Sequence, residues 1–386
     1  MSTERSIQFS LLLLAGCLTT MTGGIVAPVF PEMVQELGLN PRWAGTLLSI
    51  HALTSALMTP IMGLLADRIG KMKVMIPSLI LYSFFGISTA FLTSFPLLLA
   101  SRALLGAASG GIAAATIGIL SSMYEGESRS RVLGFATSAM TTSAILFPLL
   151  GGWVGKTHWQ YSFYLYGAGV ILLSFMLVVF NGISSKVSGM MPSGGTSELR
   201  TVLKQPQIWR IYGLIGVAAT VVYTVVIYTP LYLKAAIGAG PELNGFVLAI
   251  RAVGAAIVAA VGAAWVAKRL GENRAIALGF SLMATTIFTI PLLTHLSLIV
   301  PAAILFGIGF GIITPNLYNV LAGHTPPELR ASVLGIGTGF NSLGQFICPW
   351  LLGPVWKYAG LHSVFFAATA LAVLASFISL THPKTS

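Results

Sequence analysis

The chain has 386 residues, of which 55% are apolar and only 8% are charged, and its mean hydropathy is +0.87. A soluble domain carries about a quarter of its residues as charged side chains. This composition therefore excludes ordinary soluble enzymes, secreted disulfide scaffolds and disordered chains. Because a helix needs about 20 apolar residues to cross the hydrocarbon core, the chain has room for about a dozen membrane spans.

Apolar runs bounded by charged and turn residues predict twelve membrane helices. They cover residues 8–31, 43–65, 74–93, 96–120, 132–154, 161–181, 208–232, 243–266, 275–294, 298–320, 332–355 and 363–381. The first contains Leu14-Ala15-Gly16-Cys17, which reads like a bacterial lipoprotein cleavage box. Since the apolar run continues beyond it toward Pro28, we expect a membrane helix there instead.

The loop charges predict the orientation of these spans. Most Lys and Arg residues fall on the side that holds both termini, and the other side has only Arg42, Lys156, Lys234 and Lys357. Short cytoplasmic loops carry the positive excess, so both termini are expected in the cytoplasm of a multi-pass protein. The compact loops suit the inner membrane of a bacterium.

The chain is expected to consist of two related halves. Residues 182–207 form a polar cytoplasmic linker between six-helix bundles at 1–181 and 208–386. A constant shift of 201 residues pairs Arg68 with Arg269, Gly70 with Gly271, Gly106 with Gly307, Gly110 with Gly311, Pro148 with Pro349 and Gly152 with Gly353. Such internal repeats are typical of transporters that alternate access to a site near the midplane.

The loop between the second and third predicted spans reads Gly63-Leu64-Leu65-Ala66-Asp67-Arg68-Ile69-Gly70-Lys71-Met72-Lys73. It resembles the Gly-x-Leu-Ala-Asp-Arg-x-Gly-Arg-Lys loop of the major facilitator superfamily, with Lys71 in place of the usual Arg. A degenerate copy, Ala267-Lys268-Arg269-Leu270-Gly271, lies where the second half should have it. The resemblance covers essentially the whole chain and implies an all-α membrane fold. It also implies that Gly63, Asp67, Arg68, Gly70 and Lys71 gate the cytoplasmic side.

Two further motifs indicate a branch of that family. Pro28-Val29-Phe30-Pro31 looks like the Pro-Val-x-Pro of twelve-helix drug/proton antiporters. Pro148-Leu149-Leu150-Gly151-Gly152 is similar to their Gly-Pro-x-x-Gly-Gly, although Phe147 replaces the first glycine. Pro and Gly also mark kinks and close packing in membrane helices of any function, so Pro148, Gly151 and Gly152 are predicted as a helix-kink site.

Basic residues are the informative charges inside the spans. Arg251 lies about 12 Å deep at 1.5 Å per residue, near the place that corresponds to His51 in the first half. No Asp or Glu lies near the middle of any span. A desolvated cation needs an opposite charge, so His51 and Arg251 predict a site for an anionic, zwitterionic or amphiphilic substrate.

Proton coupling is then expected to use His51, Glu32 near the outer mouth, or Arg102, which matches the family's fourth-span arginine. A buried guanidinium is rarely idle, but Arg102 could instead reach the outer lipid headgroups. Six polar residues complete the predicted substrate site: Tyr223, Tyr228, Asn316, Asn319, Asn341 and Gln345. Each could equally serve interhelical hydrogen bonding, which contributes only about 0.6 kcal/mol on average in membranes.

The sequence thus predicts a secondary transporter that moves a small organic compound by alternating access, with proton-coupled efflux as the first hypothesis. The alternatives are an organic-anion importer or exchanger and a multidrug cation/proton antiporter. No nucleophile with a base is visible at mid-depth, so we do not expect an enzyme. Cys17 and Cys348 lie in apolar runs and the basic residues share no face. We therefore expect no metal, no other cofactor and no nucleic-acid partner, but a monomer with protons, substrate and lipid as its partners.

Overall fold

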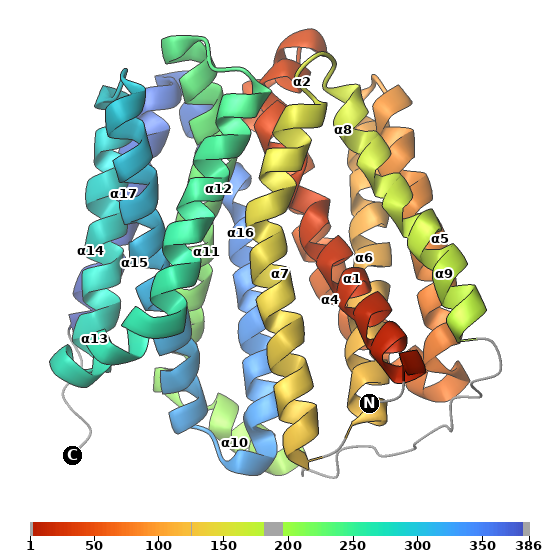
Figure 1. Ribbon diagram of the computed structural model, residues 1–386. Helices are drawn as coiled ribbons and strands as arrows, with labels where there is room; N and C mark the ends of the chain where they lie inside the picture. Colours follow the sequence, from red (N-terminus) through yellow and green to blue (C-terminus); the bar gives the residue numbers. More distant parts are fainter. Residues whose placement is uncertain (1–2, 125, 181–195, 381–386) are drawn as a thin grey trace. The chain divides into compact units, whose positions relative to one another are not determined.

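The computed structural model describes residues 3–124, 126–180 and 196–380, and over these ranges all regular secondary structure is helical (Figure 1). Contacts between Cα atoms divide the chain into two compact units. The first comprises Met1–Leu39, Thr46–Met190 and Gly240–Gly245, and the second comprises Asn40–Gly45, Met191–Ala239 and Phe246–Ser386. Each unit is described by itself below.

The first unit is a bundle of long helices joined by short turns. Its elements are α1 (Thr3–Gly24), η1 (Ala27–Val29), α2 (Phe30–Glu36), α4 (Thr46–Ile69), α5 (Lys71–Ser88), η2 (Thr89–Phe91), α6 (Phe95–Met123), α7 (Gly126–Val154), α8 (Gln160–Tyr164), η3 (Leu165–Gly167) and α9 (Ala168–Val179). Within it, α6 packs along α4, α5 and α1, and α1 also packs on α7 and α9.

The second unit is also a bundle of long helices joined by short turns. Its elements are α3 (Pro41–Ala44), α10 (Thr196–Leu203), α11 (Pro206–Ile237), α12 (Pro241–Ile257), the π-helical turn η4 (Val258–Gly262), α13 (Ala263–Leu270), α14 (Glu272–Thr289), η5 (Ile290–Leu292), α15 (Leu296–Gly323), η6 (Pro327–Leu329), α16 (Arg330–Ala359) and α17 (Leu361–Leu380). The first residues of α12 are counted with the first unit. Here α14 packs on α15 and α17, and α11 packs on α16 and α17.

The predicted membrane spans correspond to long helices of the structure. By length and composition, 11 helical segments of the described residues can cross a membrane. The predicted span 332–355 falls inside α16, which has 30 residues but is not among them. Its apolar character is diluted by residues such as Asn341, Ser342 and Gln345. Of the predicted linker, residues 182–195 lie outside the described part of the chain, Thr196–Leu203 form α10, and α11 begins at Pro206.

The helices expose apolar side chains on their outer faces. Leu57, Phe84, Ile171 and Phe175 in the first unit are more than half exposed, as is Phe377 in the second. Such surfaces are stable in lipid, where the backbone polar groups are satisfied inside each helix. The all-α membrane fold predicted from the sequence is confirmed.

The repeat reappears in the backbone. Gly70 has φ 107° where α4 gives way to α5, and Gly271 has φ 84° where α13 gives way to α14. L side chains rarely adopt such positive φ values, so each turn requires glycine. The two residues stand at the same place in the two halves, 201 positions apart.

Two short segments pack with helices that come from the other half of the chain. In the first unit, a Cβ atom on Gly152 would overlap the carbonyl oxygen of Pro241, and one on Gly245 would overlap that of Pro148. In the second unit, a Cβ atom on Gly353 would overlap the carbonyl oxygen of Arg42. The repeated Pro and Gly positions of α7 and α16 therefore receive the starts of α12 and α3.

Candidate functional site

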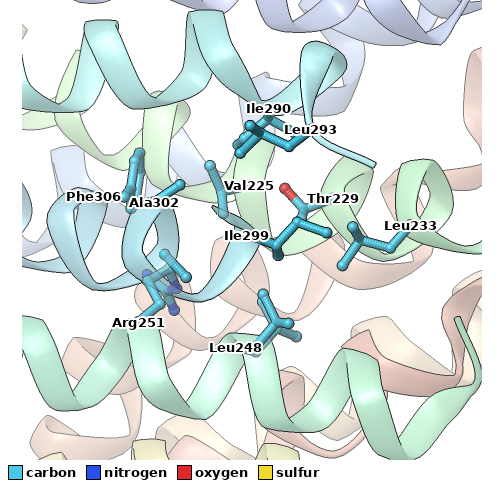
Figure 2. A pocket seen from close by; sticks show the side chains of 12 residues that line it. Val225, Thr229, Leu233, Leu248, Arg251, Ile290, Leu293, Ile299, Ala302 and Phe306 are labelled. Atoms are coloured by element: carbon cyan, nitrogen blue, oxygen red, sulfur yellow. The ribbon is translucent and has the colours of Figure 1, made fainter. Parts of the chain in front are cut away.

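The second unit contains a narrow cavity with one cationic side chain (Figure 2). It is bounded by Val225, Thr229 and Leu233 of α11 and by Val247, Leu248 and Arg251 of α12. The turn η5 and helix α15 supply the remaining wall, including Ile299, Ala302, Ala303 and Phe306. The space between the lining atoms, together with its open mouth, is about 410 Å³, and little of it is wide enough to hold water. The cavity is therefore a slot rather than a chamber.

The slot has a deep end and a shallow end. Arg251 and Phe306 lie at one end of it and Leu233 at the other, with Thr229 between them (Figure 2). Arg251 is the tenth residue after Pro241, about 15 Å along α12 at 1.5 Å per residue. Leu233 is close to Ile237, where α11 ends. The charge is thus held deep in the unit, and the apolar part of the slot extends from it toward the helix ends.

The Arg251 side chain has a nitrogen that forms no hydrogen bond. Its Nε atom is buried without a hydrogen-bond partner, and Tyr223 is near enough to interact with it electrostatically. Among the described residues, no ion pair joins a carboxylate to Arg251. The residue as a whole is half-buried. A guanidinium without a counter-ion is costly in the membrane, and it offers a site for an anionic group.

His51 occupies the position in the first unit that Arg251 occupies in the second. A Cβ atom on Gly106 would lie 2.5 Å from the carbonyl oxygen of His51, and one on Gly307 would overlap that of Arg251. The sequence shift of 201 residues paired Arg251 with Ile50, one residue away, whereas packing on the repeated glycines pairs it with His51. His51 is buried, its Nδ1 atom has no hydrogen-bond partner, and Arg102 is near enough to interact with it.

Arg102 is turned into the first unit and does not reach toward lipid headgroups. Only 1% of its surface is exposed. Its Nη1 atom donates to the Tyr166 hydroxyl at 2.9 Å, and its Nη2 atom donates to the Thr22 carbonyl oxygen at 2.6 Å. Its Nε atom donates to the Leu47 carbonyl oxygen at 3.4 Å, and the Tyr166 hydroxyl donates to Thr22 as well, at 2.7 Å. The guanidinium thereby joins α1, α4, α6 and η3.

The other predicted polar residues do not line the slot. Tyr228 is buried with its ring against Trp356 of α16, 5.8 Å between centroids, and its hydroxyl has no hydrogen-bond partner. Asn316 is buried and its Nδ2 atom donates to the carbonyl oxygens of Ile312 and Ala263, at 2.8 and 3.4 Å. These contacts favour the helix-packing alternative for Asn316.

The polar pair on α16 is satisfied within its own helix. The Gln345 Nε2 atom donates to Asn341 Oδ1 at 2.7 Å, and both side chains are half-buried. Asn319 is exposed on α15. Of the substrate-site residues predicted in the second unit, only Arg251 therefore lines the slot, with Tyr223 beside it.

Thr229 is the slot residue that the sequence did not single out. Only 4% of the residue is exposed, and its buried hydroxyl has no hydrogen-bond partner. Thr220 and Thr224 on the same helix instead donate to the carbonyl oxygen four residues earlier. The spacing of Val225, Thr229 and Leu233 marks one helical face, and a lone hydroxyl on that apolar face was the available signal.

Comparison with known proteins decides the family. The model of the Major Facilitator Superfamily matches residues 12–349 and 226–385. The chain belongs to the major facilitator superfamily. It is a multi-pass membrane transporter and not an enzyme.

Curated relatives of this transporter include the Quinolone resistance protein NorA of Staphylococcus aureus, 24% identical over 344 residues, which are 86% of each chain. The class E Tetracycline resistance protein of Escherichia coli is 24% identical over 363 residues, covering 90% of this chain and 86% of its own. A bacterial homolog of the human lysosomal transporter Spinster, in an inward-facing and occupied conformation, has a TM-score of 0.79 at 16% identity. That alignment covers 98% of this transporter and 97% of the other chain.

The predicted gating loop of this transporter is the turn between α4 and α5. Asp67 and Arg68 are exposed, and the described part of the chain gives Asp67 no ion pair. Gly63 and Gly70 are half-buried, and the stem of Lys71 lies 3.4 Å from the place of a Cβ atom on Gly118 of α6. The geometry fixes the turn at Gly70 and leaves the gating role of this loop as a prediction.

The remaining predicted residues of this transporter lie in the first unit. Pro148 is inside the continuous helix α7, and a Cβ atom on Gly151 would overlap the carbonyl oxygen of Ile25. Gly151 thus allows α7 to approach the end of α1, as the close-packing alternative expects. Glu32 is half-buried in the first turn of α2.

Proposed function

We propose that this protein is a secondary transporter that exports a small organic anion, zwitterion or amphiphile by alternating access, coupled to protons. The observation that carries the proposal is Arg251, which lines an apolar slot deep in the second unit without a carboxylate to pair with. A substrate anion would supply the missing counter-charge.

The charge pattern also ranks the alternatives. A lipophilic cation would have to enter a slot whose single charged side chain is positive, with no acidic residue lining it. Like charges in a medium of low dielectric repel strongly. The multidrug cation/proton antiporter is therefore the weaker candidate, while an organic-anion importer or exchanger would use the same site.

Outward transport is supported by the relatives. NorA and the class E protein are named for resistance to quinolones and tetracycline, which a protein that exports these drugs would provide. We propose the same direction here, in a bacterial inner membrane with both termini in the cytoplasm and with the protein acting as a monomer.

For proton coupling, the groups available are His51, Arg102 and Glu32. Arg102 is held by carbonyl and hydroxyl oxygens rather than by a carboxylate. His51 is the buried titratable group beside it, with an unpartnered Nδ1 atom. We propose His51 as the proton carrier, with the buried Arg102 side chain beside it.

Proteoliposomes that contain a pH-sensitive dye test the proposal. Organic anions, zwitterions and lipophilic cations are added in turn to the wild type, Arg251→Gln and Arg251→Lys. We expect proton movement with anions or zwitterions, loss of at least tenfold in rate in Arg251→Gln and partial retention in Arg251→Lys.

Two outcomes would contradict the proposal. Flux driven by lipophilic cations and unaffected by Arg251→Gln would establish the cation antiporter instead. Uptake of a labelled anion with no proton movement at any imposed gradient would leave an exchanger or uniporter and remove the role of His51. Thr224→Ser, a conservative change on the face of α11 away from the slot, serves as the matched control for protein insertion.

A further inference from the structure

We infer that the slot beside Arg251 binds a slender amphiphilic monoanion, with its charged group at Arg251 and an unbranched aliphatic chain directed toward Leu233. This inference rests on the proposed function and names the substrate class of its site. It rests on three features of the slot: its charge, its shape and the free hydroxyl of Thr229.

The charge is confined to one end. Arg251 is the only ionisable residue that lines the slot, and its Nε atom is buried without a hydrogen-bond partner. The other walls are apolar apart from Thr229. A ligand that satisfies this distribution carries one negative group at its end and has an apolar remainder, because a second charge would be desolvated without a partner.

The shape selects a thin chain. From Val225 to Leu233 the slot extends along α11 for about 12 Å at 1.5 Å per residue. Little of it is wider than a water molecule. A fused ring system is far wider than such a slot, so an extended alkyl chain is the apolar group that requires the least movement of the lining side chains.

The Thr229 hydroxyl adds selectivity for a polar group part-way along the alkyl chain of the ligand. Its hydroxyl lies on the slot wall between the charged end and Leu233, buried and without a hydrogen-bond partner (Figure 2). A buried hydroxyl gains from any acceptor or donor placed opposite it. A chain that carries a hydroxyl group near its middle is therefore expected to bind more tightly than the plain chain.

Binding of straight-chain carboxylates to the purified full-length protein in nanodiscs tests the inference, with empty nanodiscs subtracted. Each methylene buried in the slot should raise the affinity about fourfold from butanoate to octanoate. The gain should cease once the chain outgrows the slot. Octanol and octyltrimethylammonium, which have the same chain without the anion, should bind at least tenfold more weakly than octanoate.

Variants separate the contributions. Arg251→Gln should reduce octanoate affinity to that of octanol, and Arg251→Lys should retain most of it. Ala302→Leu fills the slot beside Arg251 and Phe306 and should weaken both octanoate and butanoate at least tenfold. The matched control is Ala370→Leu on the exposed face of α17, which should bind like the wild type. Thr229→Val should remove the preference for mid-chain hydroxylated octanoate over plain octanoate.

Several outcomes would overturn the inference. An octanoate affinity that Ala302→Leu leaves unchanged, or a carboxylate affinity that does not depend on alkyl-chain length, would show that the alkyl chain binds outside the slot. A phospholipid retained in the slot, detected by native mass spectrometry and not displaced by octanoate, would identify a lipid site instead. If octanoate binds as described but is not transported in proteoliposomes, the proposed function is wrong and the inference about the ligand of the slot stands. If Arg251-dependent anion transport occurs without these binding effects, only the slot inference fails.

Discussion

Replacing Gly307 with alanine tests the contact that holds Arg251 in place. A Cβ atom on Gly307 of α15 would overlap the Arg251 carbonyl oxygen and come within 2.9 Å of the Ala255 backbone nitrogen on α12. Both neighbours are backbone atoms, so no side chain can rotate away and the two helices must separate. Overpacking of this kind costs about 1–3 kcal/mol, against a gain of roughly 0.5–1 kcal/mol when alanine replaces glycine within a helix.

We therefore expect Gly307→Ala to lower the free energy of unfolding by about 1–2 kcal/mol and to reduce Arg251-dependent transport. The matched control is Gly335→Ala on α16, where a Cβ atom meets nothing within 4 Å. It should stabilise the protein by roughly 0.5–1 kcal/mol. Unfolding in mixed micelles, followed by tryptophan fluorescence, measures both variants. Equal stabilisation of the two would refute the close approach of α12 and α15.

Three further substitutions are expected to change stability in graded amounts. Arg102→Gln leaves buried carbonyl and hydroxyl oxygens without donors and should cost roughly 2 kcal/mol or more; unchanged stability with transport abolished would show instead that Arg102 acts in transport itself. Gly70→Ala should cost about 1–3 kcal/mol because φ is 107° and ψ is 138° there, whereas Gly63→Ala inside α4, where a Cβ atom would lie 4.0 Å from its nearest neighbour, should stabilise by roughly 0.5–1 kcal/mol. Lys156→Ala should change the free energy of unfolding by less than about 1 kcal/mol, because the side chains of Lys156 and its partner Glu242 are 55% and 51% exposed. A larger loss of stability in low salt would indicate that this pair is more than a surface contact.

Helix positions and the internal repeat could be predicted from the sequence, because both depend on patterns along the chain. The shift of 201 residues anticipated that Gly70 and Gly271 would stand at equivalent turns. It misplaced the partner of Arg251 by one residue, because a fixed offset cannot register a one-residue difference in length between the halves. Packing on Gly106 and Gly307 shows the true pairing with His51.

The functional site was harder to predict, because the direction in which a side chain points matters more there than its depth in the membrane. Arg102 could not be oriented from its place six residues after Pro96, and only its acceptors in other helices show that it points inward. The same holds for the polar residues of α11. Tyr228 and Thr229 are neighbours in sequence, but the first faces α16 and the second lines the slot. No composition or spacing rule distinguishes them without knowing which helices pack on each face.

The segments at Asn40–Gly45 and Gly240–Gly245 have a consequence for biosynthesis. Each is counted with the unit whose other helices come largely from the opposite half of the chain. A growing chain that has inserted α1 to α9 therefore still lacks the stretch that covers Gly152 and Pro148, and it must wait until Pro241 and Gly245 have left the ribosome. Neither half of the gene encodes a complete unit, so the two halves depend on each other from the moment of membrane insertion.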